Sequence, residues 1–258
     1  MNTATLPIST IDHPEEARPV ITIEHVYKSF GTNTVLKDFS MTVEKGENVV
    51  VLGRSGVGKS VLIKCIIGLM KADEGSVILL DKDINGLDHE EMDKMRARVG
   101  FLFQSNALYD SMTVRKNLEF PLRRHWIETS REEMDAMVLE ALENVGLAHT
   151  VDMMPEELSG GMKKRIALAR TLILRPEIIL YDEPTTGLDP VTGKEISMLI
   201  MDVQAKYHTS SIIISHDMHC VKRTAGRIVL LMDGRNYCTG TYEELSRSDD
   251  PVVKQFFE

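Results

Sequence analysis

A glycine-rich segment at the junction of a strand-like and a helix-like stretch is the feature that most constrains how this chain can fold. Residues 53–60 read Gly-Arg-Ser-Gly-Val-Gly-Lys-Ser, with the spacing Gly-x-x-x-x-Gly-Lys-Ser. The apolar run 48–52 precedes the segment, and an apolar helical stretch, 61–69, follows it. Glycines there let successive backbone N–H groups curl around phosphate oxygens, and a helix N-terminus adds partial positive charge. The spacing therefore predicts a phosphate-binding loop in which Lys59 contacts the β- and γ-phosphates and Ser60 ligates Mg²⁺.

Two acidic residues follow a second apolar run, 178–181. A metal-bound triphosphate needs an acidic anchor in addition to the loop, and Asp182 stands at a strand end where it can hold the Mg²⁺ shell. Its neighbour Glu183 is placed to polarise an attacking water. Adjacent carboxylates also occur in solvated turns, but together with a phosphate-binding loop they indicate an ATP·Mg²⁺ site.

Apolar runs alternate with helical periods over most of the chain. The runs 211–214 and 228–231 are continuously apolar, as in strands that are covered on both faces of a parallel sheet. Residues 39–43 alternate between apolar and polar, the pattern of a half-buried strand. Helical periodicity recurs at 134–145 and 196–203. This order predicts an α/β fold with a mainly parallel sheet.

Domain boundaries follow from the same patterns. Residues 1–19 combine prolines, Ser/Thr and acidic residues and are expected to form a flexible tail. The main domain is expected to span 20–245, and 105–174 shows no central strand, which indicates a helical subdomain inserted into the sheet. The remaining residues, 246–258, form an amphipathic tail that either contacts a partner subunit or folds back on its own domain.

Charge and composition exclude several classes of protein. Among 258 residues, 30 Lys plus Arg stand against 39 Asp plus Glu, a net charge of −9 that argues against a nucleic-acid binder. No apolar run approaches the ~20 residues that cross a bilayer, and no secretory leader is evident. The three cysteines, Cys65, Cys220 and Cys238, lie far apart, as is typical of reduced thiols in a cytoplasmic protein.

Residues 158–165 read Leu-Ser-Gly-Gly-Met-Lys-Lys-Arg. Ser159 is expected to cap a helix, and Gly160 and Gly161 leave backbone N–H groups uncovered, so the segment predicts a second phosphate cradle. It resembles the LSGGQ signature of ABC (ATP-binding cassette) ATPases, with Met162 in place of the usual Gln. The resemblance implies a head-to-tail dimer in which Ser159, Gly160 and Gly161 close over the ATP of a second copy of the chain.

Four further residues occur in the order of that family's motifs. Phe30 resembles the aromatic residue that stacks on adenine, and Gln104 resembles the Q-loop glutamine that senses Mg²⁺. Asp189 resembles the D-loop aspartate at the dimer interface, and His216 resembles the switch histidine that contacts the γ-phosphate. The family fold is a P-loop NTPase nucleotide-binding domain whose mainly parallel core carries an antiparallel β subdomain as well as the helical subdomain.

The resemblance also assigns roles to sets of residues. The ATP contacts of the chain's own loop would come from Gly53, Arg54, Ser55, Gly56, Val57, Gly58, Lys59 and Ser60. The catalytic residues would be Glu183, His216, Gln104 and Lys59. The Mg²⁺ ligands would be Ser60, Gln104 and Asp182.

A narrower resemblance lies in 103–123 and 154–162, which are similar to the MlaF-type ATPases of MCE/Mla phospholipid transport systems. It implies an integral-membrane, MlaE-like permease and an MCE-domain protein as partners, at the cytoplasmic face of the inner membrane. It leaves open whether a small regulatory subunit joins them. Leu108, Tyr109 and Met112 are candidates for an apolar surface that docks the permease. The alternative is that they belong to the core of the helical subdomain.

The two resemblances together imply the ATP-hydrolysing subunit of an ABC transporter that moves phospholipid between the inner and outer membranes. One alternative is the ATPase of an importer or exporter for another solute. A second is a soluble ABC ATPase that acts on ribosomes or DNA. This second alternative is disfavoured because the chain has one phosphate-binding loop, one signature segment and no long heptad stretch.

Overall fold

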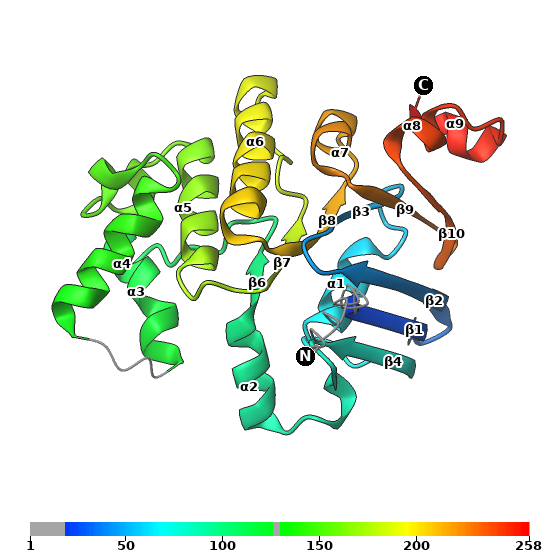
Figure 1. The fold of residues 1–258 in the computed structure, drawn as a ribbon, viewed down its shortest axis with the longest axis horizontal. Helices are drawn as coiled ribbons and strands as arrows, with labels where there is room; N and C mark the ends of the chain where they lie inside the picture. The colour runs from blue at the N-terminus through cyan, green and yellow to red at the C-terminus, as the bar shows by residue number, and fades with distance from the viewer. Residues whose placement is uncertain (1–18, 126–129, 258) are drawn as a thin grey trace, which may run out of the picture.

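The parallel sheet expected from the apolar runs is present. The structure is a computed structural model that describes residues 19–125 and 130–257. In the larger sheet the strand order is β10-β9-β3-β8-β7-β6, and all neighbours are parallel except the β10–β9 pair (Figure 1). Its strands are β3 (Asn48–Leu52), β6 (Val99–Leu102), β7 (Ile178–Asp182), β8 (Ser210–Ser215), β9 (Arg227–Met232) and β10 (Arg235–Gly240).

A smaller sheet is antiparallel throughout, as the family resemblance implies. Its order is β2-β1-β4-β5. Its strands are β1 (Pro19–Phe30), β2 (Asn33–Glu44), β4 (Glu74–Leu79) and β5 (Lys82–Asp83). In β2 the residues Phe39, Met41 and Val43 are buried and alternate with more exposed ones, which confirms the predicted half-buried strand.

The burial of β3 explains why its sequence is apolar without interruption. Val49 and Val51 pack in one core with helix α1 (Lys59–Ile66) and the antiparallel sheet. Val50 and Leu52 point to the other face, where they pack with helix α6 (Pro190–Tyr207). Successive side chains of a strand alternate between faces, so a strand covered on both sides needs apolar residues at every position.

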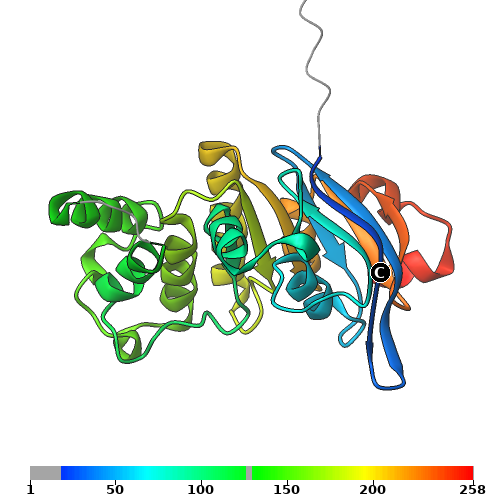
Figure 2. The same cartoon turned by 90° about the horizontal axis from the view of Figure 1, so that it is seen from below.

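Three helices form a group at one end of the molecule, next to β6 and α6 (Figures 1 and 2). They are α3 (Val114–Arg124), α4 (Arg131–Glu143) and α5 (Gly160–Leu172). A third core, with Leu118, Leu142 and Ile166 at 0% exposure, holds them together. The described residues between 105 and 174 contain no strand.

The other α-helices of the described ranges are α2 (His89–Arg98), α7 (Met218–Thr224), α8 (Tyr242–Ser246) and α9 (Pro251–Phe257). Helix α9 folds back on its own domain: Val253 is 2% exposed in the core around α6, and Gln255 accepts a hydrogen bond from Arg54. The tail predicted for 1–19 lies outside the described residues except for its last position.

Two expectations about composition can be compared with the described residues. Cys65, Cys220 and Cys238 are free thiols, and burial raises the pKa of Cys65 to about 11. In the described ranges, none of the helices combines the length and the apolar character that a membrane crossing requires.

Candidate nucleotide-binding and catalytic site

The chemically important residues meet because their strands are parallel neighbours. Strands β3, β8 and β7 lie side by side in that order, so their carboxyl ends share one edge of the sheet. The glycine-rich loop of 53–60 follows β3, the Asp182–Glu183 pair ends β7, and His216 follows β8. We call this edge, with those residues, the catalytic edge.

Lys59 is the centre of the loop. Its side chain is buried, and its Nζ donates to the carbonyl oxygens of Gly53 at 2.7 Å and Arg54 at 3.1 Å. The same Nζ lies 3.8 Å from Glu183 Oε1. Burial lowers the pKa of Lys59, and the carboxylates of Glu183 and Asp182 act in the opposite direction. The loop therefore holds a cation in place inside a closed turn.

The N-terminus of α1 is built to receive an anion. Gly58 precedes the helix with φ 111°, and no side chain of the described chain caps the first turn. A Cβ on Gly58 would lie 2.7 Å from Val35 Cγ1, so only glycine fits this close approach. The open N–H groups and the buried Lys59 together fit the phosphates of a nucleotide.

Two oxygen-bearing side chains lie where a nucleotide-bound Mg²⁺ is expected. The Ser60 hydroxyl donates to Asp182 Oδ1 at 3.4 Å. Burial raises the pKa of Asp182, an effect that the Ser60 hydrogen bond opposes. Hydroxyl and carboxylate oxygens suit Mg²⁺, which commonly takes its remaining ligands from phosphate and water. Nowhere in the described ranges do three His, Cys, Asp or Glu side chains gather as a metal site.

Glu183 is the most tightly held carboxylate of the catalytic edge. His216 Nδ1 lies 2.9 Å from its Oε1 and 2.8 Å from its Oε2, and the Thr186 hydroxyl donates to Oε2 at 3.2 Å. The backbone of Glu183 has φ 49°, in the left-handed region that non-glycine residues rarely adopt. Such strain recurs at functional sites, where surrounding bonds maintain it.

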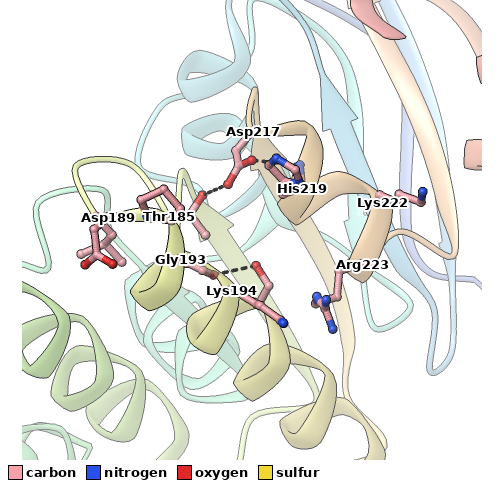
Figure 3. Close-up of a pocket in the computed structure, with 11 residues that line it drawn as sticks. Thr185, Asp189, Gly193, Lys194, Asp217, His219, Lys222 and Arg223 are labelled. Carbon is pink, nitrogen blue, oxygen red and sulfur yellow. Dashed lines mark hydrogen bonds between the residues drawn. The ribbon is translucent and has the colours of Figure 1, made fainter.

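The two loops that carry His216 and Asp189 are joined beside a groove of about 810 Å³ between α6 and α7 (Figure 3). Thr185 donates to Asp217 Oδ2 at 3.0 Å, and Asp217 Oδ1 caps α7 through the His219 N–H. Asp189 caps α6 through the N–H groups of its first turn. The sequence patterns did not single out Thr185 or Asp217, because their contact joins loops that are distant in the chain.

The signature segment, residues 159–161, lies at the start of α5. Ser159 caps this helix by accepting from the Met162 N–H at 3.3 Å, as predicted. Ser159 and Gly160 are exposed. A Cβ on Gly161 would lie 2.6 Å from Thr192 Cγ2 of α6, so glycine there permits close helix packing. Hydrogen bonds of the described residues do not join this segment to the catalytic edge.

The side chains of Phe30 and Gln104 take no part in the hydrogen bonds of the catalytic edge or of the signature segment. Phe30 is 48% exposed at the end of β1, with Lys28 Nζ 5.6 Å from its ring centre, and an exposed ring can stack on a base. Gln104 follows β6 and is exposed, and its amide makes no hydrogen bond to the described residues. Its backbone carbonyl accepts from Lys164 at 2.9 Å. Burial lowers the pKa of Lys164 to about 8.

The three candidate docking residues have different surroundings. Tyr109 is 42% exposed and lines a groove of about 450 Å³ together with Phe101, Phe103 and Phe120. The Tyr109 and Phe120 rings are 4.8 Å apart. Leu108 instead packs against two of the apolar cores, and Met112 is half-buried outside the groove lining. Of the three candidates, Tyr109 is the one that lines this groove, which it shares with three other aromatic side chains and with basic residues such as Arg124 and Arg170.

The fold and the site define a phosphate-binding-loop nucleotidase of the α/β class. The family described as "ABC transporter" matches residues 36–186, and the chain belongs to this family. It therefore carries the ATPase domain of the family, whose ligands are ATP and Mg²⁺. Residues 36–186 include the phosphate-binding loop, the signature segment and the Asp182–Glu183 pair.

Three known proteins illustrate the relationship. "Probable ribonucleotide transport ATP-binding protein mkl" of Mycobacterium bovis is 40% identical over 92% of this chain, and the chain spans 66% of its length. "Protein TRIGALACTOSYLDIACYLGLYCEROL 3, chloroplastic" of Arabidopsis thaliana is 37% identical over 92% of the chain and 73% of its own length. The dimeric cassette MJ0796 bound to ADP and Pi has a TM-score of 0.79 and 32% identity, covering 86% of this chain and 98% of that one.

Proposed function

We propose that this chain is the ATP-hydrolysing subunit of an ABC transporter that moves phospholipid between the inner and outer membranes. The observation that carries the hydrolytic part is the convergence of Lys59, Glu183 and His216 at the catalytic edge, with Glu183 Oε1 3.8 Å from Lys59 Nζ and 2.9 Å from His216 Nδ1. A carboxylate held between two nitrogen groups beside a phosphate-binding loop is placed to orient and activate water.

The proposed reaction uses each residue for one task. Lys59 and the loop N–H groups bind the β- and γ-phosphates. Ser60, Asp182 and Gln104 would hold Mg²⁺, which would supply neutralisation of the phosphate charge. Glu183 polarises the attacking water, and His216 fixes the Glu183 carboxylate and contacts the γ-phosphate. Phe30 stacks on the adenine ring.

The proposed assembly is a head-to-tail pair of chains. Ser159 and Gly160 are exposed and unlinked to their own chain's catalytic edge, so they are free to bind the ATP of a second copy. Asp189 would lie at the interface of the two copies. The relative MJ0796 is dimeric with ADP and Pi bound, which supports this arrangement.

The aromatic groove beside Gln104 is the proposed docking site of an MlaE-like permease, with Tyr109 as the contact predicted from the sequence. Four aromatic rings give a binding surface of high apolar content at low conformational cost. The complex would also contain an MCE-domain protein and a small regulatory subunit, and would lie at the cytoplasmic face of the inner membrane.

Phospholipid is proposed as the cargo because residues 103–123 resemble MlaF-type ATPases and because one relative's name contains trigalactosyldiacylglycerol, a lipid. The mycobacterial relative is named for ribonucleotide transport, which favours the alternative of another solute. A soluble role on ribosomes or DNA is the remaining alternative.

Detergent purification of the tagged chain from its own cells separates these proposals. A co-purifying polytopic membrane protein with bound phospholipid, identified by mass spectrometry, is the expected result. A permease that carries no lipid and whose ATPase activity responds to another solute would replace the cargo proposal. Recovery of ribosomes or DNA without any membrane protein would overturn the transporter proposal altogether.

A further inference from the structure

The signature helix α5 carries a buried lysine whose role the catalytic edge does not explain. Lys164 is 1% exposed, and its Nζ donates to the carbonyl oxygens of Gln104 at 2.9 Å and Phe103 at 3.5 Å. In the described part of the chain, no carboxylate lies within ion-pair distance of this ammonium group. Burying a charge without a carboxylate partner costs stability, so the presence of a lysine at this buried position needs an explanation.

A second cation of the same helix continues the contact. Arg170 donates to the carbonyl oxygens of Asn106 at 3.1 Å and Ala107 at 2.9 Å. Asn106 and Ala107 both have left-handed backbones, with φ 65° and 51°. Two consecutive non-glycine residues in this region store strain, and the guanidinium binds both of their carbonyls. We call residues 103–107 the Q-loop; one helix thus holds four of its five carbonyl groups.

Lys164 lies close both to the Q-loop and to the signature segment. The Gln104 amide has no hydrogen bond to the described residues, so its position depends on its backbone, which Lys164 holds. The signature segment begins the same helix, one turn before Lys164. A displacement of the Q-loop is therefore transmitted to the signature segment through a short, rigid piece of helix.

We propose that Lys164 is a positioning residue that couples the two ATP sites of the dimer, by fixing the Q-loop of one site to the signature segment that the same chain presents to the other. The inference rests on the proposed function, in which Gln104 contacts the chain's own ATP and Ser159–Gly161 contact the partner's. Binding of ATP in one site then favours closure of the second site, which is a coupling between sites in the thermodynamic sense.

The test compares Lys164→Met with Lys163→Met in the full chain, measuring ATP hydrolysis against ATP concentration. Lys163 is the adjacent lysine and is half-buried, and its side chain makes no hydrogen bond or ion pair with the described residues, so its variant controls for loss of a charge from α5. We expect a wild-type Hill coefficient of about 2, the limit for two sites. Lys164→Met should bring it to about 1 and lower kcat about tenfold, with ATP affinity of the single site within about twofold.

Lys164→Arg retains donors for the Q-loop carbonyls and should recover most of the cooperativity. If Lys164→Met does not fold, Lys164→Leu replaces it in the same comparison, because its side chain is also neutral and donates no hydrogen bond. A Hill coefficient unchanged from wild type in the folded neutral variant overturns the coupling, and so does a wild type without cooperativity.

A second measurement separates failure of the coupling from failure of the proposed function. In a Glu183→Gln background, light scattering reports ATP-dependent dimerisation, and adding Lys164→Met should raise the ATP concentration needed about tenfold. If Glu183→Gln alone forms no ATP-dependent dimer, the proposed trans site is wrong. If it dimerises and Lys164→Met changes neither dimerisation nor cooperativity, only the coupling is wrong.

Discussion

The catalytic edge and the signature segment are both phosphate cradles at helix N-termini, yet they differ in completeness. At the catalytic edge, Lys59 is 6% exposed and Glu183 7% exposed, and each is held by several partners. In the signature segment Ser159 and Gly160 are exposed, and within the described ranges the side chain of Ser159 bonds only to the first turn of its own helix. One cradle is assembled within the chain, and the other presents donors outward, as expected for a surface that is completed by a second molecule.

The largest effect is expected from a variant that disables the catalytic edge and leaves the signature segment intact. Glu183→Gln keeps the shape of the side chain and its contacts with His216 but removes the base, so hydrolysis should fall by about 10²–10⁴-fold. ATP binding should persist, and an ATP-bound dimer should accumulate in size-exclusion chromatography. Glu177→Gln is the matched control, because Glu177 directly precedes β7 and Glu183 directly follows it. This control should keep wild-type turnover. Wild-type hydrolysis by Glu183→Gln would show that another group activates the water.

A mixing experiment tests the division between the two cradles. Lys59→Ala damages only the catalytic edge, and Gly160→Asp places a carboxylate in the signature segment. A Cβ at Gly160 meets only Leu188 Cδ2, at 3.9 Å, so the fold should survive. Each variant alone should lose about 100-fold in hydrolysis. In a mixture, the mixed dimer contains one intact composite site, so activity should rise above that of either variant alone, with about a quarter of wild type as the upper limit that two independent sites would reach. Failure of the mixture to exceed the single variants would falsify the composite site.

A moderate effect, on stability, is expected from the Arg227–Glu47 ion pair, which links the strands β9 and β3 of the larger sheet. Arg227, at the start of β9, donates to both carboxylate oxygens of Glu47, at 2.7 and 2.8 Å, next to the start of β3. Burial is the largest single influence and would raise the pKa of Glu47. The hydrogen bonds from Arg227 and from the Glu44 N–H, together with the charge of Arg227, outweigh burial, so the pKa is lowered. The folded pKa lies below the unfolded value near 4.5, so this stability is present above that pH and is lost as pH falls through the folded pKa.

Glu47→Gln should therefore lower the free energy of unfolding by about 1–3 kcal/mol at pH 7 and flatten its decline below pH 4.5. Urea unfolding between pH 7 and 3 measures both quantities. Glu90→Gln is the control, because its pair with Lys94 is exposed and should change stability by less than about 0.5 kcal/mol. An equal loss in both variants would mean that burial of the Glu47 pair contributes nothing.

The smallest effect concerns the signature segment's departure from its family pattern. Met162 is half-buried and packs against the core of α3–α5. Met162→Gln should leave ATP hydrolysis within about twofold of wild type, because the outward donors belong to residues 159–161. A change of tenfold or more in kcat, measured with unchanged melting temperature, would show that side chain 162 reaches the nucleotide of the partner.

Local sequence patterns predicted where the loops and strand ends of the catalytic edge lie. They did not predict contacts between elements that are distant in the chain. The loop of 53–60, the Asp182 strand end and the Ser159 cap follow from residue type and neighbours, and the structure has them in place. Strand β6 was not predicted, because four residues containing a glycine give too short a pattern. The contact of Lys164 with Gln104 and the bond from Thr185 to Asp217 depend on how elements pack, which periodicity does not encode.

The left-handed backbone at Glu183 costs stability at the position of the proposed base. Glycine adopts φ 49° without strain, so Glu183→Gly would relieve the backbone, but it would also leave the buried ammonium of Lys59 without the carboxylate that lies 3.8 Å away. Relief of strain and loss of the ion pair oppose each other at this position. The strain is therefore retained together with the carboxylate that the proposed reaction needs.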